Sequence, residues 1–344
     1  MIFLSYLSGS HFIMKVLLVG IIIFLSFRYL KISKYAFISS IFLFLGTFLS
    51  FWATQYFDER MWAQWLTFTL ICVLGYHISL FHPNRITKFL IFFVVTTTIF
   101  IWILNFNFPV GKGRMFLDHQ NSALFGKTIN GLGSEVNYTA FFLVSIIAIF
   151  ALKYESFIIS LFIPVVGLLQ NNSAAFAIFV VIFGTLATKK AWIPVAILLG
   201  FFTTIFLILN LVPETGMPIF GPRYILWNTA IEVIKDFPNL GYGYSNSRSV
   251  MENVIENFDK QYYVHNGFLE AGMAGGPLFM FVGCGIIIGR LYLFILDRDY
   301  RNSALMCMAV MFITFNAGFL GSISLGGLLL SMLIGCKRQR LSRV

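Results

Sequence analysis

Apolar runs of roughly 15 to 25 residues recur along nearly the whole chain and are separated by short polar connections. A helix needs about 20 residues to cross the hydrocarbon core of a membrane, whereas the strands of a membrane barrel read as short alternating segments. The pattern therefore predicts an all-α polytopic membrane protein, a single integral membrane domain of about 11 transmembrane helices over residues 1–344. We expect spans at 12–30, 35–57, 61–81, 88–106, 137–152, 156–170, 173–188, 191–212, 267–296, 303–316 and 319–336.

Composition favours the same class of protein. Hydrophobic residues make up 58% of the chain, charged residues only 11%, and the mean hydropathy is +0.85. Such a composition is typical of an integral membrane protein and excludes a soluble globule. The first apolar run ends in Arg28 and Lys31 rather than at a small-residue cleavage site, so we interpret it as the first span and not as a cleavable signal peptide.

Basic residues in the short connections predict the orientation, because Lys and Arg collect on the cytoplasmic side. If the spans alternate, these connections all fall on one side. Their basic residues are Arg28, Lys31, Lys34, Arg85, Lys88, Lys189, Lys190, Arg298, Arg301, Lys337, Arg338, Arg340 and Arg343. A smaller extracytoplasmic loop at 107–136 and a large one at 213–266 then face the other side. This orientation explains the net charge of +10, and no basic stripe or aromatic platform indicates a nucleic acid partner.

The sequence predicts neither a metal ion nor another cofactor. Its cysteines stand singly in or beside spans, which encodes neither a disulfide framework nor a zinc site. They are Cys72, Cys284, Cys307 and Cys336. The triplet Asp297-Arg-Asp299 has the form of a metal-binding Asp-x-Asp, but the predicted topology puts it in a short cytoplasmic loop without a nucleotide-binding domain.

The large outer loop contains most of the candidate chemistry. Pro222 and Pro238 bracket about four turns of predicted helix. Arg223 lies in the first turn, where the helix dipole disfavours a cation by up to about 1 kcal/mol. Its position therefore indicates an anion bound jointly by Arg223 and the helix amides; the alternative is an interfacial arginine that touches lipid headgroups. Arg248 follows the glycine-broken turn 239–244, which would fold this second arginine back toward the first.

His265 stands where the large loop turns into a span that starts near Asn266. The N-terminal end of that span disfavours the imidazolium and keeps a neutral base available near pH 7, as general base catalysis requires. The alternative is a histidine that only anchors the span at the interface. Gly267, Ala271 and Gly275 form a small-residue face on which another helix can pack closely, and we expect this packing to hold His265 in place.

In their order along the chain, these motifs resemble the hallmarks of the O-antigen ligase and O-antigen polysaccharide polymerase superfamily. They are Arg-x-x-x-Trp at Arg223–Trp227, Pro-x-x-Gly-Tyr-Gly at 238–243, and His265-Asn266 with the glycine-rich span that follows. Asn137 matches the asparagine that the family carries before its central helices. The resemblance covers residues from about 110 to 336. Many relatives carry Ser-Arg where this chain has Gln-Asn-Asn-Ser at 170–173, so the family's second phosphate-binding arginine is missing from its usual place.

The resemblance implies a membrane glycosyltransferase that uses an undecaprenyl-diphosphate-linked glycan, in the bacterial inner membrane with its active site facing the periplasm. It implies that His265 activates the acceptor hydroxyl, that Arg223 and a second arginine, Arg248 or else Arg114, bind the leaving diphosphate, and that the transfer is inverting and independent of metal. Supporting residues would be Asn266, Asn137 and Trp227.

Within this superfamily we favour a polymerase of O-antigen or related repeat units. The chain is short, the outer loop is compact, and Asn172 departs from the more uniform ligase pattern. The implied partners are the lipid-linked glycan, membrane lipid and a chain-length regulator protein. Three alternatives stay open: a ligase that transfers the finished glycan to lipid A core, a transferase to protein hydroxyls, and a flippase of lipid-linked saccharides.

Overall fold

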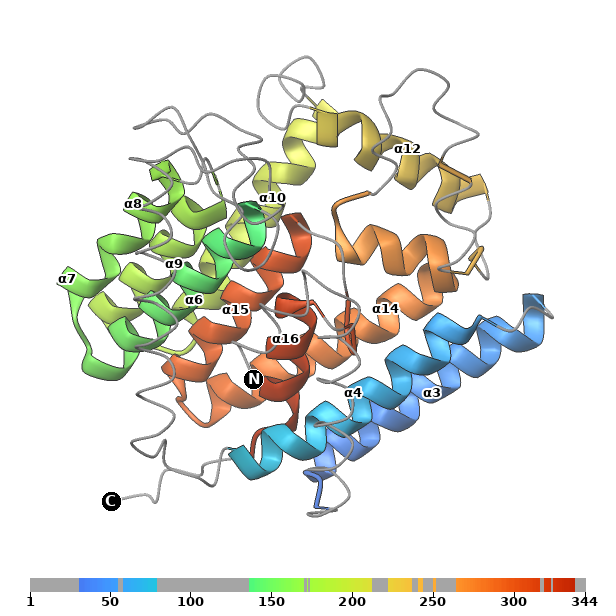
Figure 1. Cartoon of the computed structure of the whole chain (residues 1–344), viewed down its shortest axis with the longest axis horizontal. Helices are drawn as coiled ribbons and strands as arrows, with labels where there is room; N and C mark the ends of the chain where they lie inside the picture. The colour runs from blue at the N-terminus through green and yellow to red at the C-terminus, as the bar shows by residue number, and fades with distance from the viewer. Residues whose placement is uncertain are drawn as a thin grey trace, which may run out of the picture.

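A computed structural model describes residues 31–54, 58–78, 136–169, 172, 174–211, 222–236, 241–243, 250–251, 264–315, 319–322 and 324–337, and its regular elements there are all helices (Figure 1). These helices are α3 (Lys34–Thr54), α4 (Glu59–Ile78), α6 (Val136–Tyr154), α7 (Phe157–Ser160), α8 (Phe162–Leu169), α9 (Ala174–Thr188), α10 (Ile193–Leu211), α12 (Pro222–Asp236), α14 (Gly267–Leu296), α15 (Tyr300–Phe315) and α16 (Leu325–Gly335). The predicted all-α class is confirmed for this part of the chain.

Two described helices are long and apolar enough to cross a membrane: residues Lys34–Trp52 of α3, and α14. Five shorter apolar segments follow the expected spans, at Thr139–Tyr154, Phe157–Leu169, Ala174–Thr188, Ile193–Ile208 and Gly326–Gly335. The expected spans at 12–30 and 88–106 and the core of the loop at 107–136 lie outside the described residues. The number of spans, about 11, stays a prediction.

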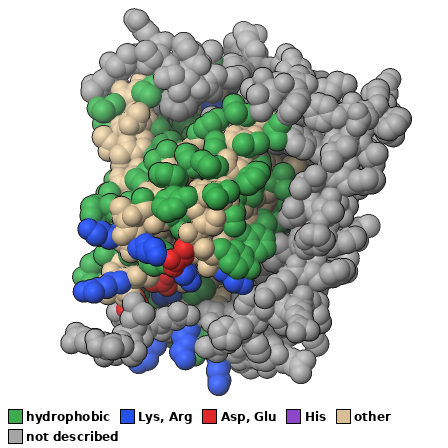
Figure 2. Space-filling model, turned by 90° about the vertical axis from the view of Figure 1, so that its left-hand side faces the viewer, with side chains coloured by type: hydrophobic (Ala, Val, Ile, Leu, Met, Phe, Trp, Pro, Cys, Tyr) green, Lys and Arg blue, Asp and Glu red, His purple; other side chains and the backbone are tan. Residues whose placement is uncertain are grey.

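The surface of the helices carries apolar side chains that a soluble protein would bury. Figure 2 shows one face on which hydrophobic side chains cover the middle, while Lys and Arg gather with acidic residues along one edge. Large exposed hydrophobic residues occur on α3, α7, α8, α9, α10 and α14. An apolar belt with a charged rim is typical of a surface that meets lipid rather than water.

Helix α15 lies at the centre of the described bundle, because it packs against α6, α9, α10, α14 and α16 and most of its side chains are buried (Figure 1). The hairpin of α3 and α4 covers one side, where α3 packs on α14 and α4 on α16. The crossing of α4 and α16 depends on glycine. A Cβ on Gly75 would lie 2.3 Å from the carbonyl oxygen of Met332, and one on Gly335 would lie 2.2 Å from that of Cys72.

The last expected span differs in its limits, because helix α16 begins at Leu325 rather than near residue 319. Gly321 has a left-handed φ of 76°, and its amide donates to the hydroxyl of Ser331 at 3.1 Å. The hydroxyl of Ser324 accepts from the amide of Gly327 at 3.2 Å and so caps the N-terminus of α16. A capped turn therefore precedes the helix within this apolar run.

The carboxylate of Glu155, in the connection between α6 and α7, joins the connection after α9 to the start of α15. Glu155 accepts hydrogen bonds from Lys189, from the hydroxyl of Tyr300 at 2.7 Å and from the guanidinium of Arg301 at 2.7 Å. These bonds, the one from Lys189 first, lower the pKa of Glu155 to about 2. Lys189 and Arg301 come from different connections, so the structure brings two of the predicted cytoplasmic loops to one side.

Candidate functional site

Trp227 of helix α12 connects that helix to the residues just before α14. Its indole N–H donates to the carbonyl oxygen of Val264 at 3.0 Å, and the side chain is only 1% exposed. Its ring also packs against that of Phe315 in α15, with the centroids 6.0 Å apart. The bond to Val264 fixes α12 to the residue directly before His265, so two of the motifs identified in the sequence lie side by side.

Asn266 forms the N-cap of α14. Its backbone is extended, with φ −150° and ψ 109°, and its side-chain oxygen accepts from the amides of Phe268 at 3.0 Å and Leu269 at 3.1 Å. These bonds satisfy two of the donors that a helix leaves unpaired at its first turn. Asn266 is buried, and the supporting role expected for it beside His265 stays a prediction.

His265 precedes this cap in a left-handed conformation, with φ 51°. That conformation costs a non-glycine residue on the order of 1 to 3 kcal/mol. Glu155, Lys189 and Arg298 have it too, so it does not by itself mark a functional site. Burial, followed by the charge of Arg223, lowers the pKa of His265 to about 4. The imidazole is therefore neutral at pH 7. The sequence predicted a neutral imidazole from the helix dipole, whereas the structure adds burial and a neighbouring cation as causes.

Arg223 lies in the first turn of α12, and its guanidinium carbon is 5.9 Å from the centroid of the Phe315 ring. Burial lowers its pKa, although a guanidinium stays charged in proteins. Within the described part of the chain Arg223 makes no ion pair. A largely desolvated cation that lacks a counter-charge favours binding of an anion. The site therefore combines a neutral base with a cation prepared for an anionic group.

The Gly-Tyr-Gly segment docks onto a break in α14. Pro277 has no amide hydrogen, so the carbonyl of Met273 loses its usual helical donor. Gly276, with φ 78° and ψ 169°, interrupts the helix at the same place. The amide of Tyr242 donates to the Met273 carbonyl at 2.7 Å, and the amide of Gly243 donates to the Ala274 carbonyl at 2.8 Å. These two bonds satisfy carbonyl groups that the break exposes.

Glycine at position 241 permits this close approach. Gly241 has φ 66°, and a Cβ there would lie 2.4 Å from both the Ala274 oxygen and the Gly276 nitrogen. The sequence predicted a turn at this segment and a continuous span for α14, without a contact between them. A signal was present in Gly-Gly-Pro at 275–277, since proline inside a span breaks the backbone ladder and requires other donors. Residues 241–243 therefore form what we call the Gly-Tyr-Gly clamp, because they hold the part of α14 between His265 and the break.

Asn137 lies on a different group of helices. The side-chain amide of Asn172 donates to the side-chain oxygen of Asn137 at 3.3 Å and accepts from the amide of Ala174 at 3.1 Å. Asn172 thus caps α9 and ties it to the first turn of α6. Helix α6 packs on α8, α9 and α15, whereas α12 packs on α14. The structure brings together Arg223, Trp227, His265 and Asn266, and it bonds Asn137 to Asn172.

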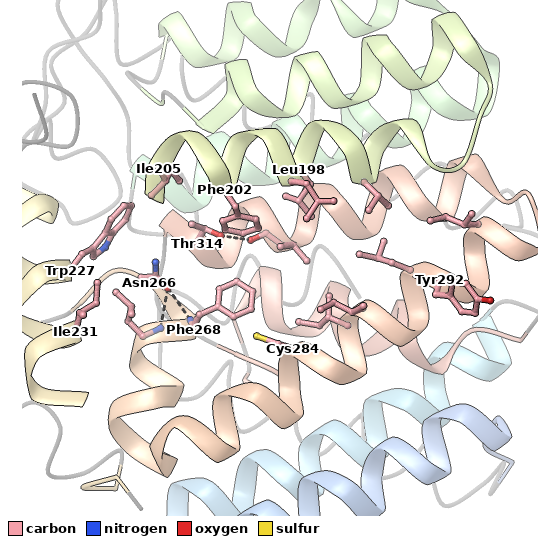
Figure 3. A pocket seen from close by; sticks show the side chains of 18 residues that line it. Leu198, Phe202, Ile205, Trp227, Ile231, Asn266, Phe268, Cys284, Tyr292 and Thr314 are labelled. Atoms are coloured by element: carbon pink, nitrogen blue, oxygen red, sulfur yellow. Dashed lines mark hydrogen bonds between the residues drawn. The ribbon is translucent and has the colours of Figure 1, made fainter. Parts of the chain in front are cut away.

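Two predicted residues, Arg248 and its alternative Arg114, lie outside the described residues. A cavity of ≈ 590 Å³ lies beside the site, between α10, α14 and α15 (Figure 3). Trp227 and Asn266 lie at the end of this cavity that is next to His265, and apolar side chains form most of the remaining wall.

Among the described residues, no group of three or more His, Cys, Asp or Glu side chains is arranged to hold a metal ion. Comparisons with protein-family models, with curated proteins and with solved structures gave no match.

Proposed function

We propose that this chain is a polytopic membrane glycosyltransferase that polymerises undecaprenyl-diphosphate-linked oligosaccharide repeat units into O-antigen or a related surface polysaccharide. The observation that carries the proposal is the pairing of a neutral His265 with a half-buried Arg223 that makes no ion pair within the described residues. Inverting glycosyl transfer needs a base for the incoming hydroxyl and positive charge for the departing diphosphate. The two side chains supply both.

In the proposed reaction, His265 removes the proton from a sugar hydroxyl of the acceptor. The hydroxyl oxygen attacks the anomeric carbon of the donor from the face opposite the diphosphate, and the bond between that carbon and the diphosphate oxygen breaks. The electron pair stays on the diphosphate, which Arg223 stabilises, and the configuration at the anomeric carbon is inverted. The second arginine of the diphosphate site is assigned from the sequence alone to Arg248, or else to Arg114.

Binding of the donor would also make His265 a stronger base. The positive charge of Arg223 is one of the two causes that lower the pKa of His265. A diphosphate bound at Arg223 offsets that charge, because opposite charge nearby favours the protonated imidazolium. The imidazole would then accept a proton more readily when the donor is in place than when the site is empty.

The proposed topology is a bundle of about 11 spans in the bacterial inner membrane, with the site facing the periplasm. Support comes from the part of α14 after the break at Gly276, whose about 20 residues extend over about 30 Å, enough to cross the hydrocarbon core of a membrane. His265 precedes the first residue of α14. Beyond its last residue lies the cluster where Lys189 and Arg301 meet Glu155. The site and the basic connections therefore lie at opposite ends of the same helix.

One observation favours a second candidate, a flippase of lipid-linked saccharides, because discontinuous helices are typical of transporters and α14 is broken at Gly276. The carbonyl groups at this break are already bonded to Tyr242 and Gly243. An ion coordinated there would have to share these oxygens with the amides of Tyr242 and Gly243. A ligase that uses the same diphosphate site remains the nearest alternative, since only the acceptor differs.

The test uses a deletion strain of the native host complemented with wild type, His265→Gln or Arg223→Ala at equal membrane levels. Lys235→Ala is the matched control, because Lys235 is an exposed basic residue of the same helix α12. A polymerase predicts that both site variants leave lipid A core with a single repeat unit, while the control gives long chains. Bare core with long carrier-linked chains would identify a ligase instead.

A second assay places the purified protein in proteoliposomes with a lipid-linked repeat unit. An enzyme lengthens or transfers the glycan, whereas a flippase relocates it without changing its length. Full activity of both His265→Gln and Arg223→Ala in cells and in vesicles would overturn the proposed site.

A further inference from the structure

The cavity beside the site is an elongated apolar groove rather than a compact pocket (Figure 3). One wall is formed by Leu198, Leu199 and Phe202 of α10, and the opposite wall by Cys284, Ile288 and Tyr292 of α14. On α14 the lining positions lie on both sides of the break at Gly276: Phe268 and Leu269 precede it, and the others fall between Cys284 and Ile295, about 17 Å along the helix. A space of ≈ 590 Å³ that continues from there to Trp227 and Asn266 fits a chain better than a compact ligand.

The groove offers almost no polar partner along its length. Asn266 lies at one end, and its side-chain oxygen already accepts from two helix amides. The hydroxyl of Thr314 on the floor donates to the carbonyl oxygen of Val310 at 2.9 Å. Water or sugar in such a groove would lose hydrogen bonds without replacement. The groove is therefore suited to a hydrocarbon chain and not to a polar ligand.

The groove opens sideways, toward the face of the bundle that meets lipid. Leu199 on one rim is 61% exposed, and Ile288 and Tyr292 on the other rim are 65% and 59% exposed. Helix α15 forms the floor through Val310 and Thr314, since both α10 and α14 pack on it. A lipid chain can therefore enter from the bilayer between α10 and α14 without crossing water.

The outer end of the groove reaches the candidate site. Trp227 and Ile231 of α12 line this end, and Trp227 lies about one helical turn after Arg223. Asn266, which also lines it, directly follows His265. An amphiphile with its chain in the groove thus places its head group beside the half-buried cation of Arg223. That combination of an apolar channel and a cation at one end is complementary to an anionic lipid.

We propose that this groove is a binding site for the isoprenoid chain of the polyprenyl-diphosphate donor, with the diphosphate at Arg223 and the chain lying along α14. The inference rests on the proposed function for the identity of the lipid, while the groove itself is a feature of the structure. Transfer of the chain from lipid to the groove gains little hydrophobic free energy, because lipid tails are as apolar as the lining. The groove therefore determines the register of the donor rather than its affinity.

This distinction gives a kinetic test. Cys284 lines the groove partway along α14, so Cys284→Trp fills it. Leu278→Trp is the matched control, because Leu278 is an exposed apolar residue of α14 that does not line the groove. Misplaced reacting groups cost on the order of 100-fold in rate. We expect Cys284→Trp to lower kcat by about that factor with little change in KM, and Leu278→Trp to keep wild-type kcat. Wild-type kcat for Cys284→Trp would overturn the inference.

A binding experiment on wild-type protein guards against a variant that fails to fold. The probe is undecaprenyl diphosphate with a diazirine on an isoprene unit near the diphosphate, crosslinked in proteoliposomes and mapped by mass spectrometry. Labels on α10 and α14 groove residues that unlabelled undecaprenyl diphosphate competes away, and excess phospholipid does not, support the inference. Labels that phospholipid removes equally well, or labels only outside the groove, overturn it.

The two proposals fail in different ways. Specific labelling of the groove by a protein that neither lengthens nor transfers glycan would contradict the proposed function and leave the groove as a prenyl site. Glycan transfer at the wild-type rate by Cys284→Trp would contradict the prenyl site and leave the proposed function standing.

Discussion

Gly241→Ala tests whether the Gly-Tyr-Gly clamp holds α14 in its broken form. Gly241 has φ 66°, and the added Cβ would lie 2.4 Å from the carbonyl oxygen of Ala274 and from the amide nitrogen of Gly276. Both are backbone atoms, so the clash cannot be relieved by rotating a side chain. The segment has to move away from α14.

The free-energy cost of Gly241→Ala follows from the strain at residue 241 and from the hydrogen bonds that are lost when the segment moves. A left-handed conformation costs alanine about 1 to 2 kcal/mol relative to glycine. Loss of the Tyr242–Met273 and Gly243–Ala274 hydrogen bonds, at 2.7 Å and 2.8 Å, costs about 0.5 to 1.5 kcal/mol each. The sum is about 2 to 5 kcal/mol, and 2 kcal/mol alone shifts the docking equilibrium about 30-fold.

Hydrogen exchange in detergent or nanodiscs measures this directly. We expect the amides of Tyr242 and Gly243 to exchange at least about 30-fold faster in Gly241→Ala than in wild type, with loss of glycan transfer. Gly285→Ala is the matched control: Gly285 lies in α14 with nothing within 4 Å of an added Cβ. Alanine is also the better helix former there. Unchanged exchange at Tyr242 and Gly243 in Gly241→Ala would refute the clamp, and so would equal acceleration in the control.

Three further predictions concern the site and the opposite end of the bundle. In wild type the acidic limb of kcat/KM should lie near pH 4, because burial and Arg223 hold the pKa of His265 at about 4. In Arg223→Gln the acidic limb of the residual kcat/KM should move to higher pH, because the charge that lowers the pKa of His265 is lost, whereas Arg223→Lys should keep it near pH 4. An unshifted acidic limb in Arg223→Gln would show that Arg223 does not lower the pKa of His265. Asn266→Ala should destabilise the protein by about 1 kcal/mol through loss of the N-cap, read as a lower Tm, and an unchanged Tm would exclude this role. Glu155 has a pKa lowered from 4.5 to about 2, so its stabilising effect is complete above pH 4.5 and is lost as the pH falls toward 2. The Tm of wild type should therefore fall more steeply than that of Glu155→Gln between pH 5 and 3, and parallel curves would show that the cluster is not stabilising.

Local features of this protein could be predicted because their causes are local. A run of apolar residues, a proline at each end or an asparagine before a span acts through neighbours within about one or two helical turns. The helix expected between Pro222 and Pro238 is observed at Pro222–Asp236, and the span expected at 267–296 is observed as α14 with Asn266 as its cap. Where a local signal was missed, at Ser324, the helix began later than its hydropathy predicted.

The contacts that make the site were decided only in three dimensions. The amides of the Gly-Tyr-Gly segment bond carbonyl groups about 30 positions further along the chain, and the neutral state of His265 depends on burial and on Arg223. Asn172, flagged in the sequence only as a departure from a family pattern, turns out to pair with Asn137. Hydropathy by itself predicted the helices, and the all-α class is confirmed for the described residues, because the apolar pattern acts on each helix separately. The groove, the clamp and the pairing of base and cation needed the tertiary structure, since no periodic pattern specifies which distant surfaces meet.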